Sequence, residues 1–123
     1  MRNQLMQIWQ QKWLMLFWMM LGLATFLLLI ELAPEPQKIP YLDKLEHATG
    51  FAVLYILGKQ AYKPHAYWLA GALILYGGLI ESLQGFLTVT RQASVYDWLA
   101  DIVGVLVAIL IINNLQKMKS QLD

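Results

Sequence analysis

The sequence has no cysteine and little charge. Without cysteine, disulfides and thiolate metal sites are excluded, and nothing indicates the redox compartment. Charged residues make up 14% of the 123 residues and hydrophobic residues 59%, against about 25% and about 45–50% in soluble domains. A chain this short has too high a surface-to-volume ratio to bury so much apolar surface. The composition therefore predicts one domain in a lipid bilayer, and the net charge of +1 gives no reason to expect a nucleic-acid partner.

Proline is also scarce, and its positions divide the chain. Residues 33–42, APEPQKIPYL, hold three of the four prolines and are predicted to form a loop, because proline removes a backbone donor and blocks helix. The apolar segments around the breaks are each about 20 residues long, which matches the hydrocarbon thickness at about 1.5 Å rise per residue. The predicted fold class is all-α, a four-transmembrane-helix bundle with one domain over residues 1–123. Its helices are expected at about residues 8–32, 43–62, 66–87 and 94–115.

The longest uncharged run is WLMLFWMMLGLATFLLLI, residues 13–30, whose 18 residues suffice to span a bilayer. A cleaved signal peptide is the alternative, but Glu31 stands where the cleavage site needs a small residue. An uncleaved helix is therefore predicted. Apolar residues at helical spacing in residues 1–12 are expected to extend this helix along the membrane surface.

Orientation follows from the basic residues, which favour the cytoplasmic side of short loops. The two termini and the predicted 2–3 loop hold six of the nine, and the opposite side holds Lys38, Lys44 and Arg91. The six are Arg2, Lys12, Lys59, Lys63, Lys117 and Lys119. Both termini are therefore predicted to be cytoplasmic. Of the eight acidic residues, all except Asp123 fall toward the outer side.

Polar residues converge at the outer ends of the second, third and fourth predicted helices. They are Asp43, Lys44, His47, Glu81, Gln84, Arg91, Ser94, Asp97 and Asp101. Charge within spanning segments costs several kcal/mol, so such residues usually face a bundle interior or a wet cavity. Gly71, Gly78 and Gly85 recur every seven residues on the side of Glu81, where they would let another helix approach closely. The pattern predicts one polar pocket open to the outer face.

Three roles are predicted within this set. His47 is the candidate general base or nucleophile, oriented by Asp43, with Glu81 as a further catalytic group. A divalent cation would be held by Asp97, Asp101 and Glu81, although no spacing is diagnostic of a metal. Phosphate of an anionic, lipid-linked substrate would be bound by Lys44, Arg91, Gln84 and Ser94. The residues leave catalysis and binding without chemistry both open.

Each polar residue also has a structural interpretation. Ser94 and Asp97 form a capping-box pattern, Asp43 suits a helix N-terminus, and Lys44 could reach lipid headgroups. Together the set could be a buried network that fixes helix register in a structural or assembly subunit. A proton or ion relay is disfavoured, because the cytoplasmic halves of the predicted helices lack ionisable residues.

The order of these residues resembles a known family. The pieces are D-K-x-x-H-x-x-x-F-x-x-L from Asp43, E-x-x-Q from Glu81, R-x-x-S-x-x-D from Arg91, and a polar residue followed by I-V-G from Asp101. Together they resemble the VanZ-like membrane proteins over residues 43–108. The resemblance implies a protein of the bacterial inner membrane that is associated with lowered susceptibility to the glycopeptide teicoplanin. It indicates this cellular compartment more firmly than it indicates a biochemical mechanism. The family usually has asparagine where this chain has Asp101, and the added negative charge favours a cation.

Overall fold

The computed structural model describes residues 1–30, 42–87 and 94–122, and these residues form helices. The helices are α1 (Arg2–Leu29), α2 (Leu42–Ala61), α3 (Ala66–Leu87) and α4 (Val95–Leu122). A short 3-10 helix, η1 (Lys63–His65), joins α2 to α3. The described residues contain no strand, so the all-α prediction is confirmed.

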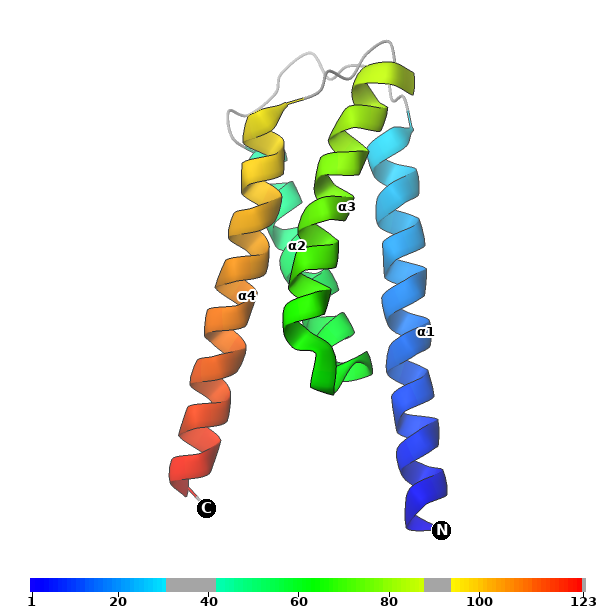
Figure 1. Ribbon diagram of the computed structural model, residues 1–123, viewed down its shortest axis with the longest axis vertical. Helices are drawn as coiled ribbons and strands as arrows, with labels where there is room; N and C mark the ends of the chain where they lie inside the picture. The colour runs from blue at the N-terminus through cyan, green and yellow to red at the C-terminus, as the bar shows by residue number, and fades with distance from the viewer. Residues whose placement is uncertain (31–41, 88–93, 123) are drawn as a thin grey trace.

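Three helix boundaries differ from the predicted ones by more than one residue: the end of α4 and both ends of α1, which ends at Leu29 rather than near residue 32. α4 ends at Leu122 rather than near residue 115, because the polar tail that follows Asn114 contains good helix formers and no glycine or proline. α1 begins at Arg2, and its first three turns continue in line with the apolar segment (Figure 1). The bounds of α2 and α3 lie within one residue of the prediction.

The helices lie side by side in a bundle whose two longest members, α1 and α4, project past η1 (Figure 1). Both chain termini lie at this projecting end. The start of α2, the end of α3 and the start of α4 therefore meet at the opposite end of the bundle.

The apolar core lies between α2 and its neighbours. Leu54, Val105 and Ala108 are fully buried where α2 packs on α4, and Phe17 is the buried side chain of α1. α4 approaches α2 closely at Gly104, where an added Cβ atom would overlap the backbone of Ala48. Glycine at this contact lets the two backbones meet, as in membrane helix pairs.

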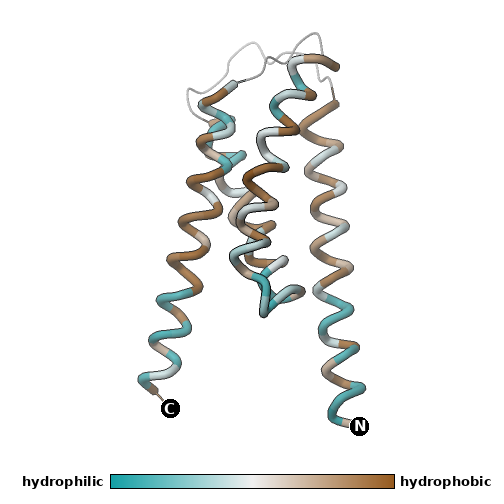
Figure 2. The backbone as a smooth tube through the Cα atoms, viewed as in Figure 1, coloured by the Kyte–Doolittle hydropathy of each residue, from teal (hydrophilic) through white to brown (hydrophobic). Residues whose placement is uncertain are grey.

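The outside of the bundle is apolar. Large hydrophobic side chains such as Trp68, Leu75 and Phe86 are exposed, and Figure 2 shows hydrophobic helices with hydrophilic turns near both termini. α1, Lys63–Leu87 and α4 are long and apolar enough to cross a membrane. Exposed apolar surface on this scale indicates a membrane protein.

α2 differs from these three helices in composition. It carries Asp43, Lys44 and Glu46 in its first turns and Lys59 near its end. Because it carries charged residues at both ends, α2 does not have the combination of length, hydropathy and low charge that marks the other three helices as candidate membrane spans. The described residues thus include three helices with the length and hydropathy of a membrane span, and the more polar α2 packs among them.

Candidate functional site

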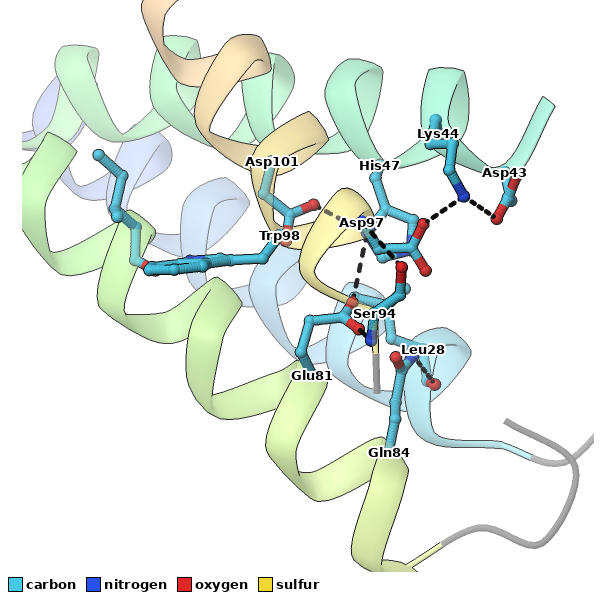
Figure 3. Close-up of polar contacts among 11 residues, drawn as sticks. Leu28, Asp43, Lys44, His47, Glu81, Gln84, Ser94, Asp97, Trp98 and Asp101 are labelled. Atoms are coloured by element: carbon cyan, nitrogen blue, oxygen red, sulfur yellow. Dashed lines mark hydrogen bonds and ion pairs between the residues drawn. The ribbon is translucent and has the colours of Figure 1, made fainter. Parts of the chain in front are cut away.

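His47 lies at the centre of a polar cluster where three helices meet (Figure 3). Its Nδ1 atom is 2.8 Å from Oδ1 of Asp101, within hydrogen-bond distance. The pair joins α2 to α4, and the side chains are only 6% and 1% exposed. The contact exists because Gly104 brings α4 onto α2 one turn beyond Asp101.

Glu81 brings a second buried carboxylate to His47 from α3. One oxygen, Oε2, accepts a hydrogen bond from the backbone N–H of Ser94 at 3.0 Å. The other, Oε1, lies 4.0 Å from Nδ1 of His47. Oε1 is buried and has no hydrogen-bond partner within the described part of the chain.

Asp97 lies on the other edge of the imidazole ring. Its Oδ2 atom is 3.9 Å from Nε2 of His47, and its Oδ1 atom accepts a 3.0 Å hydrogen bond from Lys44. The backbone N–H of Asp97 donates to Oγ of Ser94 at 3.2 Å. Ser94 is therefore the N-cap residue of α4, as the capping interpretation predicted, while the Asp97 carboxylate faces Lys44 and His47 instead of closing a capping box.

Lys44 stands at the exposed rim of the cluster. Its ammonium group bridges Asp43 at 3.1 Å and Asp97 at 3.0 Å. The Lys44 side chain is 34% exposed and that of Asp43 is 47% exposed. Exposure therefore rises from Asp101, through His47, to Lys44 and Asp43 at the start of α2.

The carboxylate that holds His47 is Asp101 and not Asp43, which corrects the predicted pairing. Asp43 and His47 are one helical turn apart, but the Asp43 carboxylate pairs with Lys44 at the rim. Asp101 arrives from a different helix, so its position depends on the packing of α4 against α2, which intrahelical spacing does not give.

The other predicted residues have the following positions. The buried Gln84 donates from Nε2 to the carbonyl oxygen of Leu28 at 2.6 Å, which ties α3 to the end of α1. Arg91 lies outside the described residues. Apart from Arg91, the predicted polar residues lie together at one end of the bundle and come from three helices, with Gln84 on the side of α1 (Figure 3).

The sequence reasoning missed two residues beside the cluster. A Cβ atom on Gly77 would lie 2.8 Å from Oδ2 of Asp101, so this glycine makes room for the carboxylate. Gly71, from the seven-residue repeat, has open space around it. Trp98 donates a hydrogen bond from its indole nitrogen to the carbonyl oxygen of Ile74 at 2.8 Å. The sequence feature that could have placed Trp98 beside the cluster is its position directly after Asp97.

No protein-family model matches the chain, and searches of curated proteins and of solved structures find no match.

The cluster is rich in negative charge. Among the described residues, the carboxylates of Asp43, Glu81, Asp97 and Asp101 face one ammonium group, that of Lys44, and the imidazole of His47, which is charged only when it is protonated. In a buried place, carboxylates this close repel one another strongly, because the dielectric constant is lower than in water. Such a set can position the imidazole as a general base or bind a cation.

An apolar cavity in the bundle is separate from this cluster. It has a volume of about 430 Å³ and lies between α1 and the η1–α3 segment. Its lining is apolar and aromatic and includes Phe17, Trp18, Tyr62, Trp68 and Tyr76. The cavity does not include the charged residues, so the candidate site is the cluster around His47.

Proposed function

We propose that this chain is a VanZ-like protein of the bacterial cytoplasmic membrane. Its polar cluster binds, or acts on, an anionic lipid-linked substrate of the cell envelope at the outer membrane face, and it affects susceptibility to teicoplanin. The observation that carries the proposal is the gathering of ionisable side chains from three helices at one end of an apolar bundle. Burial of these groups costs several kcal/mol, so selection for stability alone does not favour them.

The rim of the cluster supplies the group that would meet the substrate. Lys44 is partly exposed, and its ammonium can exchange one carboxylate partner for a phosphate oxygen of a lipid headgroup. His47 lies directly behind it, next to Asp97. A substrate phosphate at Lys44 would therefore come within reach of a histidine whose ring is held by Asp101.

The proposed topology has four membrane crossings with both termini in the cytoplasm. Both termini lie at the same end of the bundle (Figure 1), which fits an even number of crossings. The basic residues near that end, including Lys12, Lys117 and Lys119, favour the cytoplasmic side.

Reporter fusions to the two termini test this topology. We expect a cytoplasm-active reporter to give signal at both ends and a periplasm-active reporter to give none. A periplasmic C-terminus would contradict the topology and, with it, the outward position of the cluster.

A structural subunit is the second candidate, and one observation favours it. The contacts of the cluster cross between helices: His47–Asp101 and Lys44–Asp97 join α2 to α4, and Glu81 joins α3 to the start of α4. Polar contacts of this kind can fix the register of helices in a membrane complex.

Single substitutions separate the two candidates. We expect Glu81→Gln, Arg91→Ala and Asp97→Asn to abolish any effect of the protein on teicoplanin susceptibility while membrane abundance stays near that of the wild type. Both quantities are measured in the same strains, by minimal inhibitory concentration and by immunoblot of membrane fractions. Glu46→Gln is the matched control, because Glu46 is exposed on the same helix as His47. Loss of abundance across the whole set would instead support the structural subunit.

A further inference from the structure

We propose that the buried end of the cluster binds a divalent first-row transition-metal ion, such as Mn²⁺ or Zn²⁺. Its ligands are Nδ1 of His47, Oε1 of Glu81 and a carboxylate oxygen of Asp101. The inference rests on the proposed function and deepens it, because the ion would be the positive charge to which the anionic substrate binds.

The three side chains lie as metal ligands do. Their candidate ligand atoms all fall within 4.8 Å of one another, with Nδ1 of His47 at 2.8 Å from Asp101 and at 4.0 Å from Glu81. Two ligands at about 2.1 Å from one ion are between about 3 and about 4 Å apart, depending on the angle at the metal. Small rotations of the carboxylates therefore suffice to enclose an ion.

The buried oxygen of Glu81 points to a missing partner. The Glu81 side chain is 7% exposed, and Oε1 accepts no hydrogen bond within the described part of the chain. A buried polar atom without a partner costs about 1–3 kcal/mol, and more when it is charged. An ion between Glu81, His47 and Asp101 would satisfy this oxygen and balance the charge of the two buried carboxylates.

Asp97 completes the arrangement from the far side of the imidazole ring. Metal-bound histidines usually donate their second N–H to a carboxylate, which fixes the tautomer and orients the ring. When Nδ1 of His47 binds the ion, the proton of the neutral ring is on Nε2, which faces Oδ2 of Asp97 at 3.9 Å. Asp97 is itself held by Lys44 and Ser94. We therefore assign Asp97 to positioning, and not to the metal as the sequence had suggested.

The ligand set selects the class of ion. One imidazole nitrogen with two carboxylates combines a borderline ligand with hard ones, which suits Mn²⁺, Fe²⁺ or Zn²⁺ better than Mg²⁺ or Ca²⁺. The chain has no cysteine, so it lacks the thiolates that favour Cu⁺.

A bound ion also removes a difficulty in the proposed function. Carboxylates repel a phosphate, and Lys44 is already shared between Asp43 and Asp97. An ion held by His47, Glu81 and Asp101 would present positive charge behind Lys44, and phosphate oxygens are common ligands of such ions.

The test uses the full chain, purified in detergent through an affinity tag that does not depend on a metal resin. After treatment with chelator, Mn²⁺, Zn²⁺ and Mg²⁺ are added back separately. Bound metal is measured by elemental analysis, and the midpoint of thermal denaturation by circular dichroism. We expect about one Mn²⁺ or Zn²⁺ per wild-type chain and a higher midpoint with the ion than without it.

Conservative variants locate the ion. Glu81→Gln and Asp101→Asn keep the shape of the side chains, and the asparagine still offers His47 an oxygen acceptor. We expect both variants to lose at least about tenfold in metal affinity, with no midpoint shift on addition of the ion. Glu46→Gln should bind metal as the wild type does. A wild-type chain without bound ion and without a midpoint shift would overturn the proposal, as would wild-type affinity in Glu81→Gln.

The metal site and the proposed function fail in different ways. If Glu81→Gln loses the metal while teicoplanin susceptibility is unchanged, the metal site stands and the proposed function is contradicted. If the wild-type chain binds no metal but the variants lose the susceptibility phenotype at normal abundance, the proposed function stands and the metal site is contradicted.

Discussion

Replacing Gly104 with alanine is expected to lower the free energy of unfolding by about 3 kcal/mol. The added Cβ atom would overlap the carbonyl oxygen of Ala48 and would lie 2.8 Å from its carbonyl carbon. The neighbour is backbone in α2 and cannot rotate away, so α4 has to move off α2. The free energy is measured by denaturant titration of the purified protein in detergent, followed by circular dichroism.

Two other glycines provide matched controls for this substitution. Gly50 in α2 and Gly71 in α3 have nothing within 4 Å of an added Cβ atom. Alanine there removes the helix cost of glycine, so stability is expected to stay the same or to rise by up to about 1 kcal/mol. Equal effects at Gly104 and Gly71 would contradict the close contact of α2 with α4.

Replacing Asp101 with alanine is expected to destabilise the protein by a similar amount, about 3 kcal/mol. Asp101 is 1% exposed and is the hydrogen-bond partner of the buried His47. Its removal leaves the imidazole without this partner and opens a small cavity beside Gly77, whose neighbour is the Asp101 carboxylate. The same denaturant titration measures the effect.

A double-mutant cycle with His47→Ala isolates the contact itself. The combined variant should cost less than the sum of the single ones, with a coupling energy of at least about 1 kcal/mol. Asp43→Ala is the control: its carboxylate is 47% exposed in a rim ion pair, and the expected loss is below about 1 kcal/mol. Additive effects of Asp101→Ala and His47→Ala would contradict the central pair of the cluster.

The expected loss of stability determines which Asp101 variant can be used to test function. Asp101→Ala is expected to weaken the fold, so loss of activity in that variant would not separate site from scaffold. Asp101→Asn retains an acceptor for Nδ1 of His47 and changes only charge and metal affinity. The conservative variant is therefore the one that reports on chemistry.

The helices and their apolar exterior were predictable from sequence alone. Long uncharged runs such as residues 13–30 can satisfy their backbone only as helices in an apolar medium. The break between α2 and α3 was also predictable, because a proline lies in the turn at Lys63–His65 that separates these helices. The end of α4 was not predictable from the end of the apolar pattern, because helix propensity continues through the polar tail.

The membership of the cluster also followed from sequence. His47, Glu81 and Asp97 were expected at one depth, because α2 and α4 begin where α3 ends. Helical rise along an apolar segment fixes the depth of each side chain to within about one turn. This is the reason that candidate residues could be named before their contacts were known.

The pairings within the cluster were decided by tertiary structure alone. Spacing along α2 placed Asp43 beside His47, yet the carboxylate in contact is Asp101, from α4. Likewise the seven-residue repeat selected Gly71 and Gly78, while Gly77 is the glycine that accommodates Asp101. Periodicity defines the faces of one helix, but the rotation and separation of neighbouring helices depend on side-chain packing between them. Here the close contact at Gly104 sets that separation, and it thereby determines which carboxylate reaches the histidine.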